Sequence, residues 1–148
     1  MTSLVPLGAA RAAFLLALAG LGISAYLTIE HFRGVALSCP NSGIVNCTKV
    51  TTSPQSHVLG IPVALLGLLF YVVMAAVNLP PAWRSPDRRL AWVRVALVVA
   101  GMGFVLYLLV AELFVIGAIC LWCTGVHVVT FAVFAVVLTS TPALLARR

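Results

Sequence analysis

Two cysteines, Cys120 and Cys123, stand three residues apart where an apolar stretch begins. Residues at this spacing share one face of a helix and lie about one turn apart. In the first turn, the partial positive charge of the helix N-terminus favours the thiolate, the form that attacks disulfides and other electrophiles. The spacing therefore favours a redox-active dithiol, with a pair of buried structural thiols as the alternative.

The other two cysteines, Cys39 and Cys47, enclose residues 40–46, which are rich in turn formers. Such a segment can bring two Cα atoms within disulfide range. The pair could be a permanent staple, but thiol–disulfide exchange passes through mixed disulfides, so a mobile pair could visit both a soluble partner and the Cys120–Cys123 pair. We favour this shuttle. A zinc site is the rival use of four cysteines, and the wide spacing of the first pair argues against it.

The composition is that of an integral membrane protein. Of the 148 residues, 63% are hydrophobic and only 8% are charged, whereas a soluble domain carries about 25% charged residues. The mean hydropathy of +1.17 points the same way. A pI of 9.8 is typical of nucleic-acid-binding proteins too, but the basic residues form no stripe interleaved with aromatic residues, so we exclude that class.

Four apolar stretches approach or exceed the length of about 20 residues that crosses a membrane as a helix. They cover residues 12–29, 58–79, 90–114 and 119–138. The connection of residues 30–59 is the only long one, and its composition suits a segment that lies over the mouth of a bundle. The prediction is an all-α membrane protein with one domain over residues 1–148, folded as a four-transmembrane-helix bundle.

The basic residues set the expected orientation. Seven of them fall on one side of the predicted spans: Arg11, Arg84, Arg88, Arg89, Arg94, Arg147 and Arg148. Only Arg33 and Lys49 fall on the other. The positive-inside rule then places both termini in the cytoplasm and all four cysteines on the extracytoplasmic face of the cytoplasmic (inner) membrane, where disulfides persist. Glu112 is expected at the solvated outer rim, free to pair with Arg33 or Lys49.

Electrons that leave thiols inside a membrane need an acceptor. No haem, flavin or iron–sulfur motif is visible, and a lipid-soluble quinone needs only an apolar pocket with one or two hydrogen-bond donors. His127 lies one helical turn beyond Cys123. A histidine inside a span is a candidate functional residue by default, with a histidine that merely packs as the alternative.

Three further residues have expected roles near that pocket, and a fourth is expected at the membrane interface. Ser53 either covers it from the long connection or is an ordinary turn serine before a proline. Gly67 and Tyr71, four residues apart, suggest a close-packing position and an aromatic wall. Trp122 is expected to anchor its helix at the membrane interface.

The chain resembles the vitamin K epoxide reductase family, and more closely its bacterial, quinone-linked members. The matching motifs run in family order from about residue 15 to 135. They are Gly22-Ile23-Ser24-Ala25-Tyr26-Leu27-Thr28 with His31, Cys39-Pro40 and Cys47, Ser53, Gly60-Ile61-Pro62 with Gly67 and Tyr71, and Cys120-Leu121-Trp122-Cys123.

The resemblance implies a role for each cysteine. Cys39 exchanges with an extracytoplasmic thioredoxin-like partner, and Cys47 forms a disulfide with Cys39 and attacks Cys120. Cys123 lies next to the quinone, menaquinone or ubiquinone, and delivers electrons to it. No metal takes part.

Three departures from the family pattern refine this expectation. His127 stands where the vertebrate reductases have a tyrosine, and Val63 where many members have an asparagine that donates to the substrate. Both departures favour quinone reduction as the activity. Reduction of vitamin K epoxide is the first alternative function. The thioredoxin-like domain fused to many bacterial relatives does not follow here, so the partner is expected in trans. A second alternative, from another class, is a non-enzymatic membrane subunit with structural disulfides.

Overall fold

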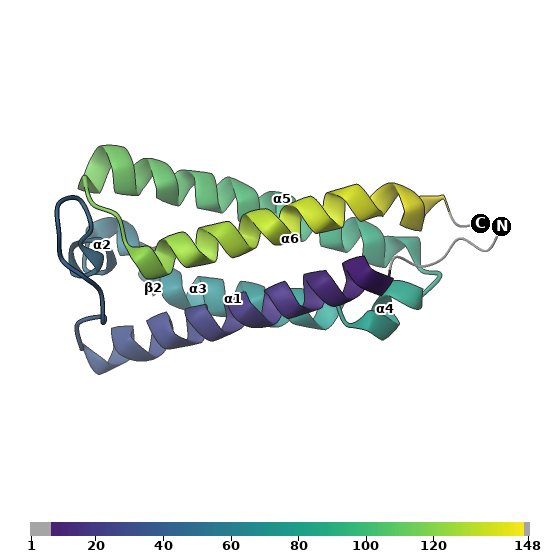
Figure 1. Cartoon of the computed structure of the whole chain (residues 1–148), viewed down its shortest axis with the longest axis horizontal. Helices are drawn as coiled ribbons and strands as arrows, with labels where there is room; N and C mark the ends of the chain where they lie inside the picture. The colour runs from purple at the N-terminus through teal and green to yellow at the C-terminus, as the bar shows by residue number, and fades with distance from the viewer. Residues whose placement is uncertain (1–6, 147–148) are drawn as a thin grey trace.

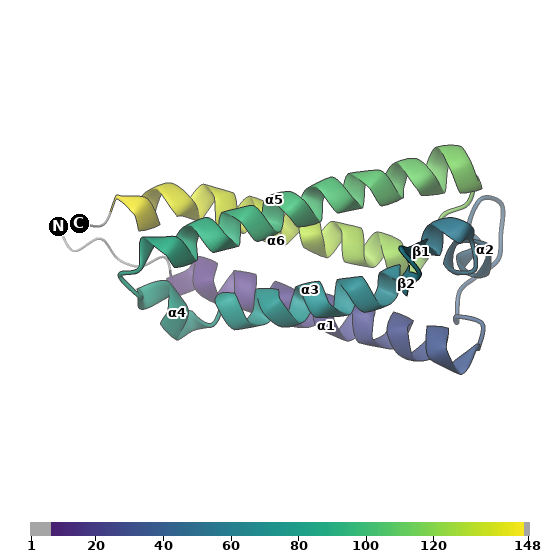
Figure 2. The same ribbon diagram turned by 180° about the vertical axis from the view of Figure 1, so that it is seen from behind.

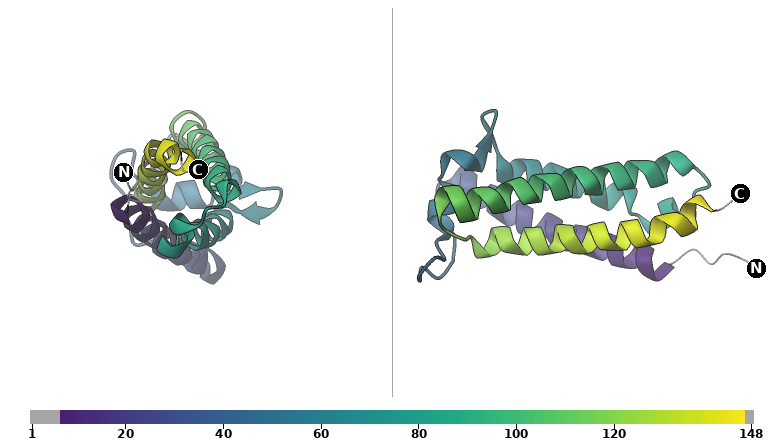
Figure 3. Two further views of the ribbon diagram at one scale, coloured as in Figure 1. Left: turned by 90° about the vertical axis from the view of Figure 1, so that its right-hand side faces the viewer. Right: turned by 90° about the horizontal axis from the view of Figure 1, so that it is seen from above.

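The computed structural model describes residues 7–146, and four helices packed lengthwise dominate it (Figures 1 and 2). These are α1 (Leu7–Arg33), α3 (Val63–Val77), α5 (Arg88–Val110) and α6 (Leu121–Leu145). A π-helical turn, η2 (Ala111–Ile116), continues α5. Seen end-on, the four helices surround a common axis (Figure 3).

The connection between α1 and α3 folds into short elements rather than an irregular loop. It contains α2 (Cys47–Thr51), the 3₁₀ turn η1 (Pro54–Ser56) and a small antiparallel hairpin of β1 (His57–Val58) and β2 (Ile61–Pro62). We call residues 34–62 the cap segment, because α2 and its neighbours lie across one end of the bundle (Figure 1). The predicted connection of residues 30–59 is therefore shifted by about three residues at each end.

Three helices described by the structure are long and apolar enough to cross a membrane. They are Leu7–Arg33, Arg88–Ile116 and Leu121–Ala143, with 27, 29 and 23 residues. The fourth, α3, is apolar but has only 15 residues, because the hairpin takes up the beginning of the predicted stretch 58–79. The all-α membrane class is thus supported, and a crossing by the fourth helix stays a prediction.

Local sequence explains where α3 and α5 begin and end. The hairpin turns at Leu59 and Gly60, both with positive φ (53° and 81°), and Pro62 then starts α3 with its fixed backbone angle. After α3, Pro80 opens the short helix α4 (Pro80–Arg84). Asp87 caps α5 by accepting a hydrogen bond of 2.9 Å from the Arg89 amide.

Small residues let α1 and α3 approach closely. A Cβ added at Gly20 would collide with the Tyr71 ring, and one added at Gly67 would lie 3.3 Å from Ser24 Oγ. Tyr71 is fully buried in the central cluster, which also includes Met74 and residues of all three other long helices. This is the close packing by small residues expected between membrane helices.

The two ends of the bundle differ in charge. The beginning of α1, the end of α6 and α4 lie at the end opposite the cap segment (Figure 1), and Arg11, Arg84, Arg88, Arg89 and Arg94 belong to elements there. Arg147 and Arg148 lie outside the described residues. Arg94, expected among the residues around a loop, is buried instead: its Nε donates to the Val77 carbonyl (2.7 Å), and its guanidinium lies 4.8 Å from the centre of the Trp83 ring.

Candidate functional site

All four cysteines belong to one apolar cluster at the capped end of the bundle. Cys47 and Cys120 are completely buried in it, and Cys39 and Cys123 are partly buried and pack against it. Two stretches that are far apart in sequence thus meet, one from the cap segment and one from the start of α6. Both cysteine pairs therefore lie at the same end of the bundle and in the same cluster.

Cys39 and Cys47 form a disulfide, with their Cα atoms 6.1 Å apart. Cys47 is the first residue of α2, and the preceding Asn46 caps that helix by accepting a hydrogen bond of 2.9 Å from the Lys49 amide. The two sulfurs differ in environment, because Cys47 is buried whereas Cys39 retains partial exposure. Of this pair, Cys39 is the cysteine that a soluble protein could reach.

Backbone hydrogen bonds join the cap segment directly to the segment before α6. The Asn46 amide donates to the Ile119 carbonyl (3.0 Å), and the Ile119 amide donates to the Ile44 carbonyl (2.8 Å). Cys47 and Cys120 each come immediately after a residue of this pairing. The backbone therefore positions the buried member of each cysteine pair.

A second set of contacts holds the Cys39 arm of the cap segment. Trp122 Nε1 donates to the Ser38 carbonyl (2.9 Å), and the Trp122 ring lies 4.7 Å from that of Tyr26, centre to centre. The Ser38 amide in turn donates to Tyr26 Oη (3.4 Å). The Trp122 indole, which the sequence suggests as an interface anchor, thus binds the cap segment instead. This hydrogen bond joins the residue before Cys39 to the residue before Cys123.

Cys120 and Cys123 are free thiols on the first turn of α6. Cys120 caps the helix, and its Sγ accepts a hydrogen bond from the Cys123 amide (3.3 Å). Both thiols therefore lie at the N-terminal end of α6, where the partial positive charge of the helix dipole favours the thiolate form.

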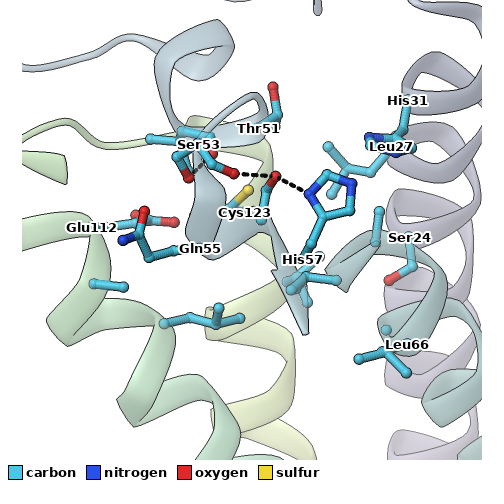
Figure 4. Close-up of a pocket in the computed structure, with 18 of the residues that line it drawn as sticks. Ser24, Leu27, His31, Thr51, Ser53, Gln55, His57, Leu66, Glu112 and Cys123 are labelled. Carbon is cyan, nitrogen blue, oxygen red and sulfur yellow. Dashed lines mark hydrogen bonds between the residues drawn. The ribbon is translucent and has the colours of Figure 1, made fainter. Parts of the chain in front are cut away.

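A cavity of about 770 Å³ lies between the helices below the cap segment (Figure 4). Cys123 is the one cysteine of the four on its wall. The same wall includes every residue that the sequence suggested for a pocket, namely Ser53, Val63, Gly67, Tyr71 and His127. The structure thus brings these residues together, from the cap segment, α3 and α6.

The polar groups of those residues are engaged to different degrees. Ser53 Oγ donates to the Val50 carbonyl (2.7 Å), so its proton serves the cap segment. Tyr71 Oη lies 3.1 Å from the Val126 carbonyl oxygen and 2.7 Å from Thr130 Oγ1, so it ties α3 to α6. His127 is 4% exposed, and its Nδ1 has no hydrogen-bond partner within residues 7–146. Of these three residues, His127 is therefore the one with a ring nitrogen free to bind a ligand.

The size and lining of the cavity fit a quinone ring. Ligand pockets commonly enclose about 300–1,000 Å³ and combine apolar walls with few polar groups. Here the walls include Leu27, Val63, Leu66 and Phe104 beside the unpartnered His127. In the described part of the chain, no three His, Cys, Asp or Glu side chains gather as a metal would require.

Glu112 corrects an expectation from the sequence. The sequence predicts a solvated side chain that is free to pair with Arg33 or Lys49, but Glu112 is 4% exposed and lies on the cavity wall. Arg33 instead lies 3.6 Å from Glu30. A signal for this burial was present, because Val98, Val105 and Glu112 follow one another at seven-residue spacing on one helix face, and both valines are buried.

The family comparison covers most of the chain. The family model described as vitamin K epoxide reductase family matches residues 11–138, a range that includes all four cysteines and every residue suggested for the pocket. No protein of curated function matches the chain significantly.

Proposed function

The chain belongs to the vitamin K epoxide reductase family, and on that premise we propose that it is a membrane thiol–disulfide oxidoreductase that oxidises an extracytoplasmic thioredoxin-like protein and reduces a quinone. In each turnover the partner dithiol becomes a disulfide, and its two electrons and two protons convert the quinone to the quinol. Such a reaction would sustain disulfide formation in secreted proteins.

The proposed order of exchange follows the exposure of the four sulfurs. The partner thiolate attacks the disulfide at the partly exposed Cys39, and the partner leaves oxidised, with Cys39 and Cys47 reduced. Cys47 then attacks Cys120 of an oxidised Cys120–Cys123 pair, and Cys39 closes the first disulfide again. Cys120 and Cys123 remain as two thiols, and the quinone reoxidises them at Cys123.

One observation carries the proposal. Of the four clustered cysteines, Cys123 alone lines the cavity, and Cys39 retains exposure at the other end of the series. The two fully buried cysteines are Cys47 and Cys120. Each comes directly after a residue of the backbone hydrogen-bond pairing that joins the cap segment to the start of α6. This arrangement suits a relay with one end for a soluble dithiol and the other for a lipid-soluble acceptor.

The proposed topology has four crossings, with α3 and its hairpin as the second. The charge difference between the two ends supports an extracytoplasmic cap segment and cytoplasmic termini. Epoxide reduction is the less favoured activity, since Val63 presents only hydrocarbon to the cavity where many family members supply a donor. The alternative of a non-enzymatic subunit needs two permanent disulfides, and the free thiols of Cys120 and Cys123 make it the less favoured one.

Alkylation of thiols in membranes tests the function most directly. With a dithiol donor and no quinone, we expect Cys120 and Cys123 to accumulate as thiols and to gain the mass of the alkylating reagent after denaturation. Addition of quinone should protect them by closing the disulfide. Mass shifts that do not respond to quinone would refute the proposed function and favour a structural role for the cysteines.

His127 provides a test of the quinone pocket. The His127→Ala variant should raise the KM for quinone by roughly fivefold, the factor that corresponds to loss of a hydrogen bond of about 1 kcal/mol. Steady-state kinetics with varied quinone at saturating dithiol would measure this, and the KM for the dithiol serves as the internal control. Unchanged quinone kinetics would show that His127 only packs.

A further inference from the structure

Glu112 is a buried carboxyl on the wall of the cavity. The chain has only three acidic residues, and Glu112 is 4% exposed at the end of an apolar helix. In the described part of the chain, no Lys, Arg or His side chain pairs with it. An ionisable group costs free energy at such a position, so a functional reason is the default explanation.

The surroundings of Glu112 indicate what that reason is. Figure 4 shows Glu112 and Gln55 on the side of the cavity away from His31 and Ser24, with Ser53 and Cys123 between the two sides. The turn that follows η2 joins Glu112 to the segment that carries the dithiol, because the Ala118 amide donates to the Glu112 backbone carbonyl (3.1 Å), two residues before Cys120. Glu112 and Cys123 thus lie on the wall of the same cavity, the one proposed for the quinone.

The chemistry of the last step calls for such a group. When the two thiols form a disulfide they release two electrons and two protons, and the quinone takes up both electrons and both protons. In a cavity with mostly apolar walls, a positioned acid–base group moves those protons faster than sparse water would.

We infer that Glu112 is the proton relay between the Cys120–Cys123 dithiol and the quinone oxygens, an inference that rests on the proposed function. The carboxylate accepts a proton from a thiol and passes it to a quinone oxygen, and it does so twice in each turnover. The sulfur–sulfur bond forms, both S–H bonds break and two O–H bonds form. Glu112 ends in the state in which it began.

Substitution of Glu112 by Gln keeps the shape of the side chain and removes the proton. For Glu112→Gln we expect kcat for quinone reduction to fall on the order of 100-fold, the usual contribution of a general acid–base group, with an unchanged KM for quinone. Reduction of the Cys39–Cys47 disulfide by a dithiol, measured without quinone, should keep its rate. That rate also verifies that the variant is folded.

Asp87→Asn is the control, since Asp87 lies at the end of the bundle opposite the cap segment and an Asn side chain can cap α5 as Asp87 does. It should retain the kcat of the unmodified protein. Glu112→Asp, which preserves a carboxyl one methylene further from the sulfurs, should recover part of the lost rate. A kcat for Glu112→Gln equal to that of Asp87→Asn would overturn the inference.

An infrared difference spectrum gives a second readout that needs no quinone. Chemical oxidation of the Cys120–Cys123 pair should change a carboxyl band, and that band should vanish in Glu112→Gln and persist in Asp87→Asn. Absence of any change in the unmodified protein would also overturn the inference. If the unmodified protein fails to reduce quinone at all, the proposed function fails; if it reduces quinone and Glu112→Gln does so equally well, only the relay fails.

Discussion

Replacement of Cys123 by alanine is expected to lower quinone reduction to the background rate, because Cys123 is the only one of the four cysteines on the cavity wall. The variant should also trap the preceding exchange. Cys120 remains in the same apolar cluster as Cys47, and we expect it to attack the Cys39–Cys47 disulfide at Cys47, which releases Cys39 as a thiol and requires no added oxidant. Quinone-dependent absorbance and non-reducing peptide mass spectrometry would measure the two effects.

Cys120→Ala is the matched control for this experiment. It also removes one thiol from the same turn of α6, and it too should fail to turn over, because no disulfide can form at that pair. It should contain no linkage between the peptides of Cys47 and residue 120. Quinone reduction at a normal rate in Cys123→Ala would contradict the proposed order of electron transfer. A disulfide between Cys47 and Cys123 in Cys120→Ala would contradict it as well.

Replacement of Cys39 by alanine should separate the two classes of reductant. Cys39 is the partly exposed sulfur of its disulfide, so a protein partner has no other accessible sulfur to attack in this pair. We expect loss of quinone reduction driven by a thioredoxin-like protein. A small dithiol, which can enter the cavity and reach Cys123, should still support a rate of the same order as in the unmodified protein.

The comparison between the two reductants is the internal control, because both are measured on one preparation of Cys39→Ala. Retained activity with the small dithiol shows that α6 and the cavity are intact. Equal loss of both activities in Cys39→Ala, as is expected of Cys123→Ala, would count against a shuttle and for a disulfide that only stabilises the cap segment.

The long helices were predictable because apolar runs of this length have few alternatives in a membrane protein. The beginning of α3 was not. Residues 58–61 are mostly apolar and read as part of a span, yet they form a hairpin whose turn residue Leu59 is 98% exposed. Hydropathy alone cannot distinguish a short exposed strand from the first turn of a buried helix.

The convergence of the cysteines with the predicted pocket residues could be anticipated from the family motifs, whereas their hydrogen bonds could not. Tyr71 reads as an aromatic wall in the sequence, but its hydroxyl lies between Val126 and Thr130, and only the packing of α3 on α6 reveals this. Glu112 was misplaced for a related reason. The end of a helix is solvated unless another segment covers it, and the path of the cap segment is a tertiary property.

The shortness of α3 has a consequence for the surrounding lipid. With a rise of about 1.5 Å per residue, its 15 residues extend over about 22 Å, whereas a typical bilayer has a hydrocarbon layer of about 30 Å. In the proposed four-crossing arrangement, a thicker bilayer would mismatch this helix before the other three. Because the hairpin that precedes α3 belongs to the cap segment, lipid acyl-chain length would then act on the geometry above the cavity without any change in the protein.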